Sequence, residues 1–153
     1  MINEGQPAPA LDLPTDGGGR VTLAALKGKP AVVYFYPKDD TTGCTREAQD
    51  FTALAPDFAA LGVPVIGVSK DTVNKHDRFK AKYNLAVTLA SDEDGAACEA
   101  WGVWVQKKLY GREYMGIERA TFLIDADGRV AKAWRNVKVA DHAAAVLEAA
   151  RAL

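Results

Sequence analysis

The sequence is poor in cysteine and histidine, with two of each among 153 residues. Cys44 and Cys98 stand far apart in the chain, a pattern that does not fit a disulfide-rich scaffold or a cysteine-based metal site. His76 and His142 have no partners at metal-ligand spacing, and both are predicted to lie on the surface of polar helices. We therefore expect no metal and no cofactor, and we expect a free thiol in a reducing compartment, the cytoplasm.

The chain also lacks an excess of charge of either sign. It has 19 basic and 20 acidic residues, for a formal net charge of −1, and no basic patch interleaved with aromatic residues. This balance gives no indication of a nucleic-acid partner or of binding to a membrane surface. No hydrophobic run approaches the length of a membrane span, and the first residues do not read as a secretory signal. We expect a protein that binds neither nucleic acid nor membranes.

Enough apolar sequence is present for a buried core. Hydrophobic residues make up 48% of the chain and charged residues 25%, so we expect residues 1–153 to form a single domain. Predicted strands and helices alternate, which indicates an α/β fold with a mixed central sheet, helices on both faces and an N-terminal β-hairpin. Residues 101–116 are predicted to be loop-rich, with their aromatic side chains in the core or a pocket wall. The predicted strands are 11–13, 21–23, 31–36, 63–69, 87–90, 119–125 and 129–134, and the predicted helices are 43–61, with a break near residue 55, 71–83, one carrying residue 98, and 141–153.

Cys44 is placed at the start of a predicted helix, which follows a buried-looking strand and a polar turn. Helix-start N–H groups and the positive end of the helix dipole favour a thiolate, which is the reactive form of cysteine. Helical spacing also puts Cys44 on the apolar stripe with Ala48 and Phe51, so a small buried residue is the alternative interpretation. A strand followed by such a helix, with a late hairpin and a terminal helix, is thioredoxin-like. The usual second cysteine three positions later is missing, which disfavours a disulfide oxidoreductase or a thiol transferase.

The segment before Cys44 reads Pro-x-x-x-Thr-x-x-Cys, beginning at Pro37, with Thr41 as its threonine. This pattern resembles the peroxidatic motif of peroxiredoxins, and the longer match resembles their Q-type subgroup, the bacterioferritin comigratory proteins. The resemblance covers nearly the whole chain and is carried by residues 36–48, 67–69 and 116–125.

The resemblance implies a role for four residues. Cys44 would attack a peroxide oxygen and become a sulfenic acid. Thr41 would hydrogen-bond the peroxide, Pro37 would shield the thiolate, and Arg119 would hold thiolate and peroxide. Taken alone, Thr41 could be only a helix N-cap, a role open to Thr42, and Arg119 a surface ion-pair partner. Nearby charges do not favour a thiolate, because the basic residues Lys38 and Arg46 are outnumbered by three acidic residues, Asp39, Asp40 and Glu47. We interpret Asp39 and Asp40 as solvated turn residues.

The chain departs from many Q-type members at the positions of their second, resolving cysteine. These positions hold Gln49 and, by our alignment, Lys80, so Cys98 is the remaining candidate. The alternative interpretation of Cys98 is a small buried residue beside Trp101. We predict a one-cysteine cycle, in which thioredoxin, glutaredoxin or glutathione reduces the sulfenic acid. The substrates would be hydrogen peroxide and alkyl hydroperoxides, and the protein a monomer or weak homodimer. The alternative is a non-catalytic thioredoxin-like module, such as a redox sensor or a holdase.

Overall fold

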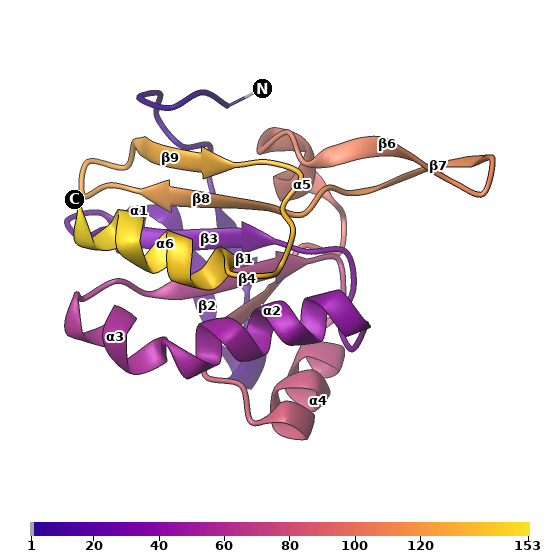
Figure 1. The fold of residues 1–153 in the computed structure, drawn as a ribbon, viewed down its shortest axis with the longest axis horizontal. Helices are drawn as coiled ribbons and strands as arrows, with labels where there is room; N and C mark the ends of the chain where they lie inside the picture. The colour runs from indigo at the N-terminus through magenta and orange to yellow at the C-terminus, as the bar shows by residue number, and fades with distance from the viewer. Residues whose placement is uncertain (1) are drawn as a thin grey trace.

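The computed structural model describes residues 2–153 and has a five-stranded mixed sheet at its centre (Figure 1). The sheet order is β5-β4-β3-β8-β9. β3 is parallel to β4 and antiparallel to β8, and both β3 and β8 are buried at every position. This burial explains why the two strands are almost entirely apolar, with Thr121 the one polar residue, and do not alternate between apolar and polar side chains. The strands are β3 (Ala31–Phe35), β4 (Val65–Ser69), β5 (Thr88–Ser91), β8 (Ala120–Ile124) and β9 (Val130–Trp134).

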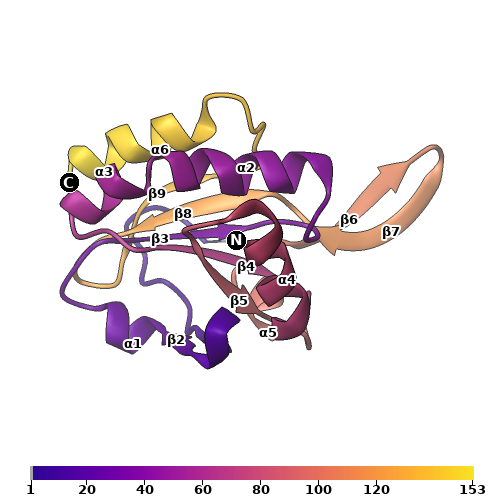
Figure 2. The same ribbon diagram turned by 90° about the horizontal axis from the view of Figure 1, so that it is seen from below.

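Both faces of the sheet are covered, as predicted (Figure 2). Helices α2 (Thr42–Ala53), α3 (Ala55–Ala60) and α6 (His142–Arg151) cover one face, in a hydrophobic cluster that contains Cys44. The other face is covered by α5 (Ala96–Ala100) and the N-terminal hairpin, in a second cluster that contains Cys98. The sheet therefore separates the two thiols. The hairpin comprises β1 (Asp12–Pro14), η1 (Asp16–Gly18) and β2 (Arg20–Thr22), followed by the short helix α1 (Leu23–Leu26).

The predicted break in the first long helix is confirmed. α2 ends at Ala53, and α3 begins at Ala55 with Pro56 in its first turn. A proline is tolerated there because the N–H that it lacks would have no helical partner. Helix α4 (Val73–Tyr83) lies against β5 and η1 at the edge of the sheet. No helix among residues 2–153 has both the length and the hydropathy needed to cross a bilayer.

The prediction of a loop over residues 101–116 is wrong. β6 (Trp104–Leu109) and β7 (Arg112–Ile117) form a hairpin that projects from the body of the protein (Figure 1). Its turn residues, Tyr110 and Gly111, have φ angles of 51° and 77°, as a tight hairpin turn requires. The arm has no continuous buried face, so its sequence lacks the alternation that marks a half-buried strand. Tyr110 and Tyr114 are exposed, and only Trp101 and Trp104 fit the predicted core or pocket wall.

Candidate active site

Cys44 lies in the first turn of α2 and is 2% exposed. Thr41 occupies the N-cap position with extended backbone angles, and its carbonyl accepts the N–H of Thr45 at 2.8 Å. The first-turn N–H groups of a helix have no partner within the helix, and they concentrate positive potential at this end. The local fold therefore gives the sulfur the environment that the sequence predicted.

Arg119 reaches this sulfur from the loop between β7 and β8. Its Nη2 donates to Cys44 Sγ at 3.3 Å, and its Nη1 donates to Glu47 Oε1 at 2.7 Å. Gly43 makes room for the approach, because a Cβ there would lie 3.1 Å from Arg119 Nη2. The fold thus brings together two residues that are 75 positions apart in sequence. Arg119 supplies the cation that the residues next to Cys44 in the sequence do not.

Glu47 is a member of the site that sequence reasoning counted only as a charge. It lies one helical turn after Cys44, is 1% exposed, and its Oε2 has no hydrogen-bond partner among the described residues. Burial raises the pKa of Glu47 to about 7, because the contact with Arg119 offsets the loss of solvation only in part. The carboxyl group therefore changes its charge near neutral pH, directly beside the thiol.

Lys107 is a second residue that the sequence did not single out. It is half-buried on β6 of the projecting hairpin. Burial lowers the pKa of Lys107, and the nearby Arg119 cation lowers it further. The projecting hairpin thus adds a second cation near the site.

The other two motif residues lie in the turn that precedes α2, which we call the motif turn (residues 37–41). Pro37 is half-buried at its start. The Thr41 hydroxyl donates to the Lys38 carbonyl at 2.8 Å and makes no helix-capping hydrogen bond. The capping interpretation of Thr41 is therefore wrong for its side chain, and its hydroxyl oxygen retains lone pairs that can accept a hydrogen bond.

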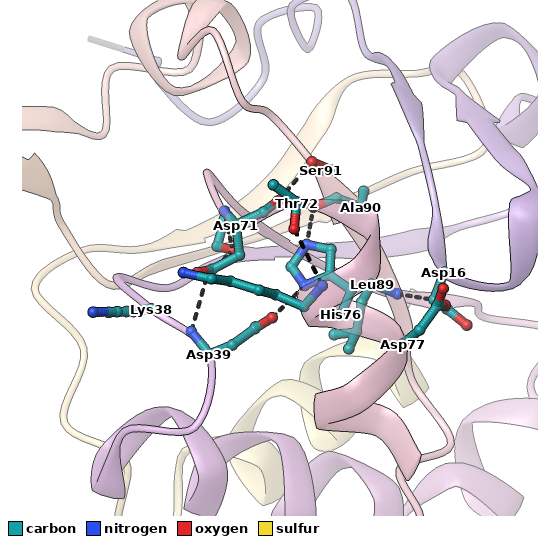
Figure 3. A network of polar contacts seen from close by, with 12 residues as sticks. Asp16, Lys38, Asp39, Asp71, Thr72, His76, Asp77, Leu89, Ala90 and Ser91 are labelled. Atoms are coloured by element: carbon teal, nitrogen blue, oxygen red, sulfur yellow. Dashed lines mark hydrogen bonds and ion pairs between the residues drawn. The ribbon is translucent and has the colours of Figure 1, made fainter. Parts of the chain in front are cut away.

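A buried polar network lies behind the motif turn (Figure 3). His76 is fully buried in α4, with Nδ1 2.7 Å from Asp39 Oδ2 and Nε2 2.9 Å from the Ala90 carbonyl. The predictions of a surface His76 and a solvated Asp39 are both wrong. Spacing could have found His76, because it stands midway between Val73 and Phe79 on the apolar stripe of α4.

His142 is also buried, contrary to prediction. His142 is the first residue of α6, and its Nε2 lies 2.8 Å from the hydroxyl of Thr121 on β8. Burial lowers the pKa of His142 to about 4, and the Arg119 cation contributes in the same direction. The ring is therefore neutral at physiological pH and serves as a hydrogen-bonded core residue.

None of the three candidate resolving positions offers an accessible thiol next to Cys44: one holds a buried cysteine on the other face of the sheet, and the other two hold residues without a thiol. Cys98 is fully buried under the opposite face of the sheet, and burial raises its pKa well above that of a free thiol. Gln49 is exposed, and Lys80 forms an ion pair with Asp16 at 2.7 Å. Within residues 2–153, no three His, Cys, Asp or Glu side chains gather as metal ligands.

Comparison with known proteins agrees with this geometry. Residues 4–133 match the model of the AhpC/TSA family. The chain belongs to the AhpC/TSA family. Among curated proteins, it is 52% identical to a peroxiredoxin Bcp of Bacillus subtilis, over 96% of this chain and 94% of the relative. It is 51% identical to a putative peroxiredoxin bcp of Coxiella burnetii, over 95% and 97% of the two chains.

A solved structure gives the same result for the fold. The bacterioferritin comigratory protein of Xanthomonas campestris, whose structure was studied for alkyl peroxide reduction, superposes with a TM-score of 0.91 at 47% identity. The match covers 98% of each chain. The predicted thioredoxin-like fold, membership of the Q-type peroxiredoxins and function as a thiol-dependent peroxidase are thereby confirmed.

Proposed function

We propose that Cys44 is the nucleophile of this peroxidase and that Arg119, Thr41 and Pro37 complete its peroxide pocket. The observation that carries the proposal is the 3.3 Å contact between Arg119 Nη2 and Cys44 Sγ at a helix N-terminus. A guanidinium and helix N–H groups both stabilise a thiolate, and a thiolate is the form that attacks peroxides.

In the first step, the Cys44 sulfur attacks the terminal oxygen of hydrogen peroxide or an alkyl hydroperoxide. A sulfur–oxygen bond forms as the oxygen–oxygen bond breaks, and the leaving oxygen departs as water or an alcohol after taking up a proton. Arg119 stabilises the negative charge that develops on the oxygens, and the Thr41 hydroxyl oxygen accepts a hydrogen bond from the peroxide O–H. Pro37 limits the access of water from its side of the pocket.

In the second step, an external thiol attacks the Cys44 sulfenic acid, water leaves, and a mixed disulfide forms. A second thiol of the reductant then attacks the mixed disulfide, which releases the Cys44 thiol and leaves the reductant as a disulfide. Support for an external reductant comes from Cys98, which is fully buried in the cluster on the opposite face of the sheet. Thioredoxin, glutaredoxin and glutathione all supply thiols of the kind required.

Two substitutions test the proposal. We expect Cys44→Ser to abolish peroxide consumption in a coupled thioredoxin assay, because serine is a far weaker nucleophile. The matched control is Cys98→Ser, which we expect to retain turnover within about twofold, because Cys98 is buried on the opposite face of the sheet and has no part in the proposed cycle. Retained activity in Cys44→Ser would refute the nucleophile, and a selective loss in Cys98→Ser would show that Cys98 resolves. Reaction of Cys44 at the rate of a free thiol would favour a redox sensor or holdase.

A further inference from the structure

The motif turn is fastened to the rest of the protein by a buried ion pair. Both ring nitrogens of His76 face hydrogen-bond acceptors, the Asp39 carboxylate at 2.7 Å and the Ala90 carbonyl at 2.9 Å. A carbonyl oxygen can only accept, so Nε2 carries a proton, and an ionised carboxylate makes the same demand on Nδ1. With an ionised Asp39, both ring nitrogens of His76 carry protons and the contact is an ion pair. Burial lowers the pKa of His76, but the contacts with Asp39 and Ala90 outweigh it and leave the pKa raised.

Asp39 makes hydrogen bonds through both carboxylate oxygens and through its backbone N–H. The Tyr36 hydroxyl donates to Oδ1 at 2.5 Å, while His76 binds Oδ2. The backbone N–H of Asp39 donates to Asp71 Oδ2 at 2.8 Å (Figure 3). The same oxygen accepts the Ser69 hydroxyl at 2.7 Å. The titratable groups that face His76 are thus Asp39, Asp71 and Tyr36. This network fixes the Asp39 backbone with respect to β3, β4 and α4.

The residues on either side of Asp39 depend on that anchor. Lys38 provides the carbonyl that orients the Thr41 hydroxyl, at 2.8 Å. Asp40 has a φ angle of 60°, a left-handed conformation that residues with a side chain rarely adopt. A turn of this kind keeps its shape only when the surrounding structure holds it. The side chain of Asp39, clamped by His76, is the part of the turn that points into the protein.

We propose that His76 is a positioning residue for the peroxidase reaction: its ion pair with Asp39 holds the motif turn so that the Thr41 hydroxyl meets the peroxide. The inference rests on the proposed roles of Cys44 and Thr41. His76 touches neither substrate nor sulfur, and it acts through Asp39, Lys38 and Thr41. A displacement of about 1 Å in a positioning group is enough to slow a reaction by roughly 10²-fold.

Two reactions of Cys44 separate positioning from simple stabilisation of the fold. Hydrogen peroxide needs the Thr41 hydroxyl in our account, whereas alkylation by iodoacetamide needs only an accessible thiolate. Loss of the ion pair should therefore slow oxidation while leaving alkylation unchanged. A purely structural role would leave both rates unchanged in the folded fraction, or alter both together.

The experiment compares second-order rate constants for both reagents in His76→Gln and Asp39→Asn. We expect oxidation to slow by at least about tenfold, and alkylation to stay within about twofold of the starting protein. Asp92→Asn is the matched control, because Asp92 is also a buried carboxylate and accepts hydrogen bonds from the N–H groups of Ala97 and Cys98, away from the motif turn. We expect this control to change neither rate by more than about twofold, even where it lowers the melting temperature.

Tyr36→Phe keeps the test decisive where the charge-removing variants do not fold. It keeps the ring and removes the hydroxyl, which donates to Asp39 and lies 3.5 Å from His76 Nδ1, and we expect a selective slowing of oxidation of about threefold or more. Oxidation and alkylation that fall together, or oxidation that is unchanged in the folded variants, would overturn the inference. Failure of the unsubstituted protein to oxidise at Cys44 would instead overturn the proposed function itself.

Discussion

Replacing Arg119 with methionine removes a guanidinium that contacts both the Cys44 sulfur and the Glu47 carboxylate. At the sulfur, the variant loses a charge-assisted donor at 3.3 Å. Removing one donor that stabilises a developing oxyanion typically slows an enzyme by about 10²–10³-fold. We therefore expect the rate constant for oxidation of Cys44 by hydrogen peroxide to fall by about that factor at pH 7.

The same substitution has a separate effect on stability, which depends on pH. It leaves Glu47 buried without its 2.7 Å partner, and breaking a buried ion pair costs about 3–5 kcal/mol when the remaining group stays charged. Glu47 can escape most of this cost by binding a proton, because its pKa is already raised to about 7 by burial. We expect a loss of about 1 kcal/mol in the free energy of unfolding at pH 6, which corresponds to the hydrogen bond alone. Above pH 7 the loss should grow by up to about 1.4 kcal/mol per pH unit.

Stopped-flow oxidation at several peroxide concentrations measures the rate, and urea unfolding at pH 6, 7 and 8 measures stability. The double variant Arg119→Met/Glu47→Gln separates the two effects. It should remove the pH-dependent part of the destabilisation, since no carboxylate remains to be buried, and it should stay as slow as Arg119→Met. A direct role for Arg119 would be refuted if Arg119→Met were oxidised by peroxide within about threefold of the original rate, or if the double variant recovered that rate.

Two further predictions concern the neighbours of Arg119. The raised pKa of Glu47 means that the folded protein binds a proton more tightly than the unfolded chain, so Glu47 lowers stability as pH rises from about 4.5 to about 7. Over that interval we expect the unfolding free energy of the protein to fall relative to Glu47→Gln by up to about 3 kcal/mol; a constant difference in urea titrations would contradict this. Gly43→Ala puts a Cβ 3.1 Å from Arg119 Nη2, and we expect it to slow peroxide oxidation by about tenfold while far-UV circular dichroism stays unchanged. An unchanged oxidation rate would show that Arg119 adjusts without loss.

Most of the fold could be predicted from the sequence, because the sheet and its helices follow apolar periodicity. The run over residues 31–36 and the Asp-Gly turn before β9 carried clear local signals. The β6–β7 arm did not, because its strands stabilise each other mainly by backbone pairing and have no continuous buried face. Strand prediction from side chains fails where side chains are not what holds the strands together.

The candidate site divides in the same way. Helix spacing predicted that Cys44 faces inward, and the motif turn was recognised by its residue types. Arg119 could be assigned only through the family resemblance, since no local pattern distinguishes it from a surface arginine. Asp39 and His76 were missed because a polar residue in a turn or on a mostly polar helix is usually solvated. Each is buried only because the other supplies its counter-charge, and that pairing exists only in the folded chain.

Mass spectrometry of the protein after one equivalent of hydrogen peroxide tests the central claim most directly. Trapping with dimedone and peptide mapping then identify the oxidised residue. We predict a gain of one oxygen atom and a single sulfenic acid on Cys44, with Cys98 left as a free thiol. An adduct on Cys98, or a disulfide between Cys44 and Cys98, would contradict it.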